Sequence, residues 1–215
     1  TISMVGLNNG NLAVKVENGS SYLSSDYGFT WAKMPTDIPG MNTIKLKSGQ
    51  LLSLKRYKFD DSLHVKYAAH LSYDDGQTWS DPYWLNSEPD FRIAMTGKLT
   101  ETSSGRIFFV CSNTLKNTNA GVHAEQIGGV EIWYSDDKGK TWKMTQRLIF
   151  ETTNINIQEA VVFELSDGTL KLYGRTPYGS LYQSTSNDNG ITWDTKLSST
   201  SIVSTMCAFN TYRDP

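Results

Sequence analysis

Apolar residues in this chain come in short runs, and the runs are joined in pairs by glycine turns. The four turns share a glycine at their fourth position and span residues 7–12, 46–51, 102–107 and 165–170. Short apolar runs bounded by glycine turns are typical of antiparallel hairpins. No apolar period of 3.6 residues lasts long enough to predict a helix. The pattern therefore predicts an all-β protein.

A second repeated string, S-x-D-x-G-x-T-W, follows each glycine turn, and we call each copy an Asp box. An aspartate accepts hydrogen bonds from the backbone of a tight turn, and glycine supplies a positive φ. The boxes do not resemble a calcium loop, which needs more oxygen ligands at closer spacing, so we predict no metal site. We expect structural corners in which the aspartates hold the turn and the tryptophans pack between sheets; these residues are Asp26, Asp74, Asp137 and Asp188, and Trp31, Trp79, Trp142 and Trp193.

Each repeat thus predicts a strand, a glycine turn, a second strand, a third strand, an Asp box and a fourth strand. Four strands in roughly fifty residues is the size of one propeller blade. The predicted blades span approximately residues 1–35, 36–85, 86–148 and 149–197, and the run at residues 201–209 resembles the first strand of a fifth. We interpret the whole chain, residues 1–215, as one part of a larger β-propeller.

Composition excludes several classes of partner. The net charge of -2 and the absence of a dense Lys/Arg patch argue against nucleic acid and against an anionic membrane. Cys111 and Cys207 lie in apolar stretches and are interpreted as buried thiols, and no residue pattern predicts a cofactor. His64, His70 and His123 are scattered and are not predicted to be catalytic bases.

Asp boxes that follow glycine-turn hairpins resemble the sialidase (neuraminidase) superfamily, whose proteins carry BNR repeats. The resemblance covers nearly the whole chain and implies a six-bladed type of β-propeller. Two segments match beyond the generic blade. Residues 44–79 resemble the first catalytic blade, and residues 156–175 resemble the segment in which a glutamate opens one strand and an arginine closes the next.

This resemblance implies a retaining glycoside hydrolase that acts on sialylated or related glycans. In the family, arginines bind the sugar carboxylate, a tyrosine activated by a glutamate attacks the anomeric carbon, and an aspartate is the general acid/base. Glu159 matches the activating glutamate, and Arg175 matches one of the arginines. The other candidates are Asp60 or Asp61 as general acid/base, and Arg56 and Arg92 as substrate-binding residues.

Several family features do not match. The expected Arg-Ile-Pro signature reads Asp37-Ile38-Pro39, and the similar string around Arg92 lies one repeat too late. Tyr212 and Arg213 follow Arg175 too soon to be the later tyrosine and arginine, which would lie beyond Pro215.

Three interpretations follow. The first is a sialidase-like glycosidase, extracellular or on the cell surface, which uses the remaining blades or neighbouring domains of a longer chain. The second is a glycan-binding or adhesion propeller that has lost the arginine clamp, with an aromatic platform formed by Tyr83, Trp84 and Tyr178. The third is a purely structural propeller.

Overall fold

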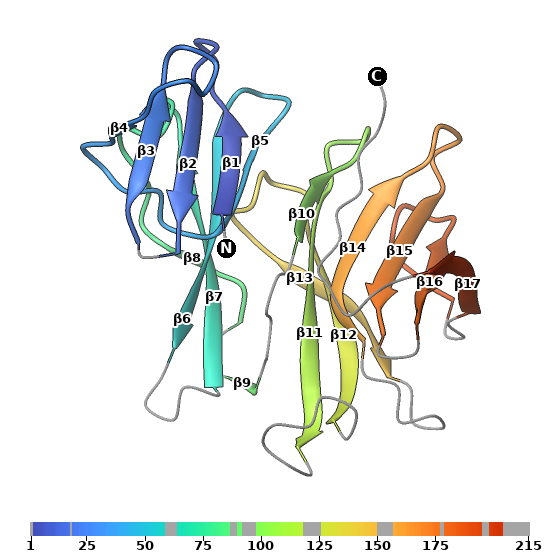
Figure 1. Cartoon of the computed structure of the whole chain (residues 1–215). Coiled ribbons are helices and arrows are strands. Elements are labelled where there is room, and N and C mark those ends of the chain that lie inside the picture. Colours follow the sequence, from blue (N-terminus) through green and yellow to red (C-terminus); the bar gives the residue numbers. More distant parts are fainter. Residues whose placement is uncertain are drawn as a thin grey trace. The chain divides into compact units, whose positions relative to one another are not determined.

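The computed structural model describes residues 2–17, 19–58, 64–86, 90–91, 98–117, 126–149, 157–176, 179–194 and 198–203. Within these ranges every regular element is a β-strand (Figure 1). The chain divides into two units, residues 1–89 with 135–142, and residues 90–134 with 143–215. No helix in the described ranges is long and apolar enough to cross a membrane.

The first unit contains two antiparallel sheets whose strands follow one another in chain order. The first sheet consists of β1 (Ile2–Gly6), β2 (Leu12–Val16), β3 (Ser21–Ser24) and β4 (Ala32–Lys33). The second sheet contains, in this order, β5 (Asn42–Lys45), β6 (Leu51–Lys58), β7 (His64–Ser72) and β8 (Tyr83–Trp84).

The second unit begins with the two-residue strand β9 (Asp90–Phe91) and contains two further sheets in chain order. The third sheet consists of β10 (Lys98–Glu101), β11 (Ile107–Asn117), β12 (Gln126–Ser135) and β13 (Lys143–Ile149). The fourth sheet consists of β14 (Gln158–Glu164), β15 (Leu170–Arg175), β16 (Ser180–Ser186) and β17 (Ser198–Val203).

These sheets confirm the predicted all-β class and the predicted order of elements. In each sheet a glycine turn joins the first two strands, and an Asp box lies between the third and fourth. The predicted start of a fifth sheet is wrong for residues 201–203, because they end β17, which pairs with β16. Residues 204–215 lie outside the described part of the chain. β17 is the last strand of its sheet, and its residues 201–203 are exposed. Because these side chains are not buried, the apolar residues among them did not indicate to which sheet the strand belongs.

Alternate residues of a strand in the first unit face the core, as β2 shows. Ala13 and Lys15 of β2 are buried, whereas their neighbours on the strand are only half-buried, as expected for a strand with one covered face. The buried cluster contains apolar side chains from both sheets and from the segment that joins them: Val5, Leu7, Ala13, Met34, Ile38 and Leu51. Leu23 and Trp79 pack against this cluster.

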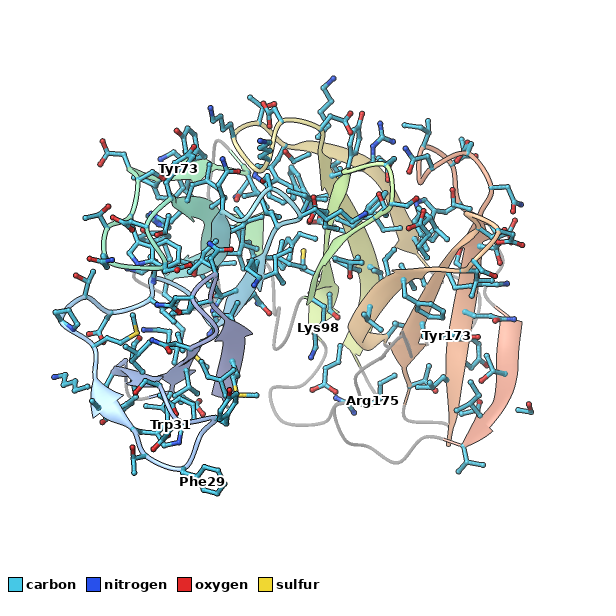
Figure 2. All side chains as sticks on the ribbon, turned by 90° about the horizontal axis from the view of Figure 1, so that it is seen from above. Phe29, Trp31, Tyr73, Lys98, Tyr173 and Arg175 are labelled. Atoms are coloured by element: carbon cyan, nitrogen blue, oxygen red, sulfur yellow. The ribbon has the colours of Figure 1, made fainter. Side chains whose placement is uncertain are left out.

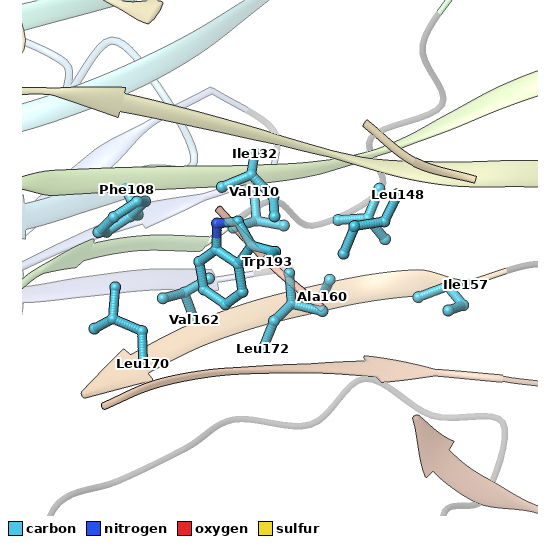
Figure 3. Packing of buried hydrophobic residues seen from close by; sticks show 11 residues of the cluster. Phe108, Val110, Ile132, Leu148, Ile157, Ala160, Val162, Leu170, Leu172 and Trp193 are labelled. Atoms are coloured by element: carbon cyan, nitrogen blue, oxygen red, sulfur yellow. The ribbon is translucent and has the colours of Figure 1, made fainter. Parts of the chain in front are cut away.

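The core of the second unit lies between the third and fourth sheets and is formed by side chains from both (Figure 3). Its buried members come from both sheets and include Phe108 and Ile132 on one side and Val162 and Leu172 on the other. Figure 3 shows the indole of Trp193 in the middle of the cluster. Its ring meets Phe108 edge to face, with centroids 6.3 Å apart, a favoured aromatic geometry.

Hydrogen bonds inside each Asp box hold its corner. In the fourth box, Ser186 Oγ donates to Asp188 Oδ1 (2.8 Å) and Gly190 N donates to Ser186 Oγ (2.9 Å). Thr192 donates to the same carboxylate from its backbone N (2.9 Å) and from Oγ1 (2.6 Å). The first three boxes repeat these four bonds. The box aspartates are therefore bonded within their own turns.

The tryptophans of the boxes do not all pack as predicted. Trp193 is 4% exposed, but Trp31 is 39% exposed, so it is not the buried plug that the repeat predicted. Trp193 packs on Phe108 of the preceding sheet, and Trp79 packs on the cluster that contains Met34. Within the described residues no sheet precedes the first one, so Trp31 lacks such a partner (Figure 2).

Acid is expected to weaken the fold through the Asp boxes. Hydrogen bonds from Thr30 lower the pKa of Asp26 from 3.8 to about 2, and those from Thr192 lower the pKa of Asp188 from 3.8 to about 2. Because the folded-state pKa is below the unfolded one, the stabilisation is complete above about pH 4 and disappears as the pH falls through about 2. Urea denaturation between these limits measures the loss.

The Asp188→Asn variant should be less stable near neutral pH and should lose less stability on acidification. Asp194→Asn is the matched control, because the carboxylate of Asp194 makes no hydrogen bond within the described residues. Only the backbone of Asp194 is hydrogen-bonded: its N donates to the carbonyl of Thr185, and its carbonyl accepts from Ser184 Oγ. An unchanged acid profile in Asp188→Asn would contradict the expected role of the box.

Candidate functional site

The candidate site begins with a β-bulge in the second unit. Gln158 of β14 pairs with Arg175 of β15, but the next pair is Val161 with Tyr173, so two residues of β14 oppose Gly174 alone. One of these two, Glu159, has a φ of 53°, a left-handed conformation that costs a non-glycine residue about 1–2 kcal/mol. Backbone strain of this kind is concentrated at functional sites in proteins.

The neighbouring side chains explain why the bulge forms here. A Cβ built on Gly174 would lie 2.2 Å from Cγ2 of Ile157, which is fully buried, so only glycine fits opposite the bulge. Ala160 is also buried and belongs to the core cluster. The bulge therefore keeps Ile157 and Ala160 in the core and turns Glu159 towards the end of β15.

Glu159 and Arg175 form a buried ion pair at this point. Arg175 Nε donates to Glu159 Oε2 at 2.7 Å, and each side chain is 9% exposed. The structure thus brings together the two residues that the sequence placed at opposite ends of one hairpin. Thr176 follows at once, and its Oγ1 donates to the carbonyl of Ser180 (2.8 Å), which ties the end of β15 to the start of β16.

Two charged residues of the second unit were not singled out by sequence reasoning. Lys98 is the first residue of β10, and Figure 2 shows it at a strand end on the same side of the second unit as Arg175. Glu131 on β12 is fully buried and accepts a hydrogen bond from Trp133 Nε1 (3.2 Å). Neither residue lies in a repeated motif or in a segment that resembles the family, so the sequence carried no signal for them.

The Glu159–Arg175 pair has chemical properties that suit part of a hydrolytic site. A carboxylate fixed by a guanidinium and shielded from water is held in one orientation, ready to accept a proton or polarise a hydroxyl group. The guanidinium is the group best suited to bind carboxylates in proteins. The functional roles of Glu159 and Arg175 remain predictions.

The remaining predicted site residues either lie outside the described residues or belong to the first unit. Asp60, Asp61 and Arg92 lie outside the described residues. Arg56 is exposed on β6, where its backbone pairs with Tyr67 in the first unit.

Asp37, which occupies the place of the signature arginine, also belongs to the first unit. Its Oδ1 accepts a hydrogen bond from Ser21 N at 2.7 Å, which ties the segment before β5 to β3.

The aromatic platform of the binding interpretation is only partly described, since Tyr178 lies outside the described residues. Trp84 is exposed on β8, with its ring centroid 5.0 Å from that of Tyr57 and with Lys66 Nζ 4.4 Å from its own centroid.

His70 is buried in a hydrogen-bonded position. Its Nδ1 lies 2.9 Å from the carbonyl of Ser80, so this nitrogen carries a proton, and its Nε2 is hydrogen-bonded with Tyr57 Oη at 2.9 Å. The side chain of His64 is not described, and His123 and Cys207 lie outside the described residues. Cys111 is a buried free thiol. Among the described residues, no group of three or more His, Cys, Asp or Glu side chains is placed to hold a metal ion.

Solved structures share this arrangement of sheets. The chain superposes on the alpha-L-arabinanase of Penicillium chrysogenum with a TM-score of 0.64 at 17% identity, covering 93% of this chain and 65% of that one. It superposes on the NanB sialidase of Streptococcus pneumoniae with a TM-score of 0.60 at 15% identity, covering 95% of this chain and 52% of that one. The fold is that of a sialidase-like β-propeller.

Sequence comparison gives the family. A family model described as a BNR repeat-like domain matches residues 56–211, and the chain belongs to this family. A sialidase of Paraclostridium sordellii is 26% identical over 190 residues, which cover 76% of this chain and 46% of that protein. The chain therefore spans less than half the length of that curated relative.

Proposed function

We propose that the chain is part of a glycoside hydrolase that cleaves sialylated or related glycans with retention of configuration. The observation that carries the proposal is the buried Glu159–Arg175 pair at a strained bulge, in the segment that resembles the catalytic part of sialidases. The sialidase and arabinanase among the similar proteins support glycan cleavage as the reaction class.

The residues have distinct roles in this proposal. Glu159 activates the nucleophile by accepting its proton, and Arg175 orients Glu159 and contributes positive charge to the substrate side. Asp60 or Asp61 is the proposed general acid/base. A Tyr nucleophile paired with a Glu is a known exception among retaining glycosidases and avoids repulsion between a carboxylate nucleophile and an acidic sugar.

A second substrate class has specific support. Asp37 stands where the resemblance places an arginine of the carboxylate clamp, so the clamp is not complete at that position. A neutral pentose glycan needs no such clamp, and the arabinanase has a fold similar to that of this chain. We therefore include α-L-arabinosides among the candidate substrates.

Assay of the intact gene product with aryl glycosides tests the proposal. Aryl α-sialoside and aryl α-L-arabinofuranoside are compared with aryl β-glucoside and β-galactoside as controls. Release of the aryl group from one of the first two, with NMR detection of the retained anomer as first product, is the expected result. No hydrolysis of any glycoside, combined with saturable glycan binding, would replace the enzyme by the adhesion propeller.

A further inference from the structure

Four side chains of the second sheet form a cationic and aromatic face that the proposed function does not use. Lys55 and Tyr57 are alternate residues of β6, so both lie on the same face of the sheet. Tyr57 pairs with Lys66 of β7. Ala68 of β7 pairs with Lys55 on one side and with Trp84 of β8 on the other. Since directly paired residues share a face, two lysines and two aromatic residues come together, and we call these four side chains the lysine–aromatic face.

A buried histidine orients the tyrosine ring. Tyr57 pairs with Lys66, but its Oη reaches His70, four residues further along β7, and lies 2.9 Å from Nε2. The ring therefore extends along β7 past Ala68, whose short side chain leaves room for it. His70 is 7% exposed, and its Nδ1 is held by the carbonyl of Ser80 at 2.9 Å. Two successive hydrogen bonds thus fix the tyrosine to the sheet.

The tyrosine in turn supports an exposed tryptophan. The ring centroids of Tyr57 and Trp84 are 5.0 Å apart and the rings are tilted by 55°, a favourable aromatic contact. Trp84 is 41% exposed, so part of its side chain is open to a ligand. Tyr83 precedes it on β8 and lies on the opposite face. An aromatic ring that is already held in place offers flat apolar area at a small cost in entropy, and the C–H groups of a sugar ring fit such an area.

A lysine ammonium group lies over each ring. Lys66 Nζ is 4.4 Å from the centroid of Trp84, and Lys55 Nζ is 4.7 Å from that of Tyr57, both within the range of cation–π interactions. Within the described ranges, neither ammonium group has an ion-pair or hydrogen-bond partner. The face is therefore complementary to a ligand that combines apolar ring surface with negative charge.

The type and number of the cations indicate the kind of anion. Lysine is a compact point charge, whereas bidentate contacts to carboxylates are typical of arginine. Arg56, the arginine of β6, lies on the opposite face of the sheet. Nucleic acids carry a phosphate on every nucleotide and require a denser array of cations than two lysines in a chain of net charge -2. These properties favour spaced, singly charged sulfate groups on a sugar chain.

We propose that the lysine–aromatic face binds a sulfated polysaccharide. A sugar ring stacks on the exposed part of Trp84, and the ammonium groups of Lys55 and Lys66 bind sulfates. Because each ammonium group lies over a different ring, the two bind sulfates on separate sugars of one chain. All four side chains belong to β6, β7 and β8 of the first unit, so this binding does not depend on the Glu159–Arg175 pair of the second unit.

Titration calorimetry of the intact protein with three matched oligosaccharides tests the proposal. A κ-carrageenan hexasaccharide carries sulfates, its desulfated form is uncharged, and a hyaluronan hexasaccharide carries the same number of charges as carboxylates. The sulfated sugar is expected to bind about tenfold more tightly than the desulfated one, and more tightly than hyaluronan. Added salt should weaken its binding, because the charges are exposed. Equal affinity for the sulfated and desulfated sugars, equal or tighter binding of hyaluronan, tighter binding of an oligothymidylate, or no saturable binding would overturn the proposal.

Two variants with matched controls test the residues. Trp84→Ala should weaken binding of the sulfated sugar about tenfold, a usual effect of removing an aromatic anchor. Trp31→Ala is its control, because Trp31 belongs to the same unit and is 39% exposed. Lys66→Gln should weaken binding about two- to fivefold and reduce its dependence on salt. Lys58→Gln is the control for Lys66, since it makes the same change on the paired strand but on the opposite face. The proposal fails if either variant binds as tightly as its control.

The catalytic proposal is tested separately. Glu159→Gln should leave the affinity for the sulfated sugar unchanged, since Glu159 belongs to the second unit. If Glu159→Gln abolished this binding in a folded protein, the sugar would be bound at the catalytic pair, and the proposal for the lysine–aromatic face would be wrong. Absence of glycoside hydrolysis, with the binding of the sulfated sugar intact, would refute the catalytic proposal alone.

Discussion

Glu159→Gln is expected to reduce kcat for the best glycoside substrate by about 10²–10⁴-fold, the usual range when a general base is removed. The amide retains an oxygen that accepts from Arg175 Nε, so the 2.7 Å contact and the bulge can persist. KM should change little. The measurement is steady-state kinetics on the intact protein, with circular dichroism to verify the fold.

The substitution at Glu159 is preferred to one at Arg175. Removal of the guanidinium would leave the buried Glu159 carboxylate without its ion-pair partner, which would destabilise the fold by about 3–5 kcal/mol. A loss of activity in such a variant could then result from unfolding as well as from a lost catalytic group.

Glu164→Gln is the matched control for Glu159→Gln. Glu164 lies on the same strand, but its carboxylate accepts hydrogen bonds from the backbone N (2.6 Å) and Oγ (2.5 Å) of Ser103. These bonds connect the end of β14 to the glycine turn at residues 102–107. This variant should keep its activity and lose some stability. If Glu159→Gln kept more than about a tenth of the wild-type kcat, or if Glu164→Gln were equally inactive, Glu159 would not have the proposed role.

Trp193→Ala is expected to lower the free energy of unfolding by about 3–5 kcal/mol, the usual cost of truncating a buried aromatic residue. Trp193 is surrounded by the core of the second unit, where its ring meets Phe108, and its indole N–H donates to the carbonyl of Gly190 (3.1 Å). Urea denaturation followed by circular dichroism measures the loss.

Trp31→Ala provides the comparison within the same motif. Trp31 makes the same indole bond, to Gly28 at 3.0 Å, but its side chain is far more exposed. Its removal should cost less than half as much, because less apolar surface leaves the core. Equal losses in the two variants would mean that the turn itself, rather than packing against the neighbouring sheet, gives the tryptophan its importance.

The sequence predicted the strands and corners because the interactions that form them are local. In each Asp box, the hydrogen bonds join residues at most four positions apart, so the eight-residue string contains all the groups that the corner needs. Prediction failed at β17, where Ser198 begins the strand without an apolar signal. An edge strand with exposed side chains can form from polar residues, since backbone pairing alone holds it.

The candidate site was predicted in part for a similar reason. Glu159 and Arg175 flank one hairpin, so strand pairing brings them to one end of the sheet, and the family resemblance drew attention to them. Their burial and the bulge were not predictable, because they depend on Ile157 filling the space beside Gly174. Asp60, Asp61 and Arg92 stay predictions, since they lie outside the described residues.

By itself, then, the sequence determined the all-β class, the four hairpin repeats and the corners, because each is specified by hydrogen bonds and turn conformations within a few residues. Only the tertiary structure decided which tryptophans are buried, that Glu159 and Arg175 form a shielded pair, and that the rings of Tyr57 and Trp84 meet beside two lysines. These properties depend on packing between side chains that are distant in the chain, and no local pattern encodes that packing.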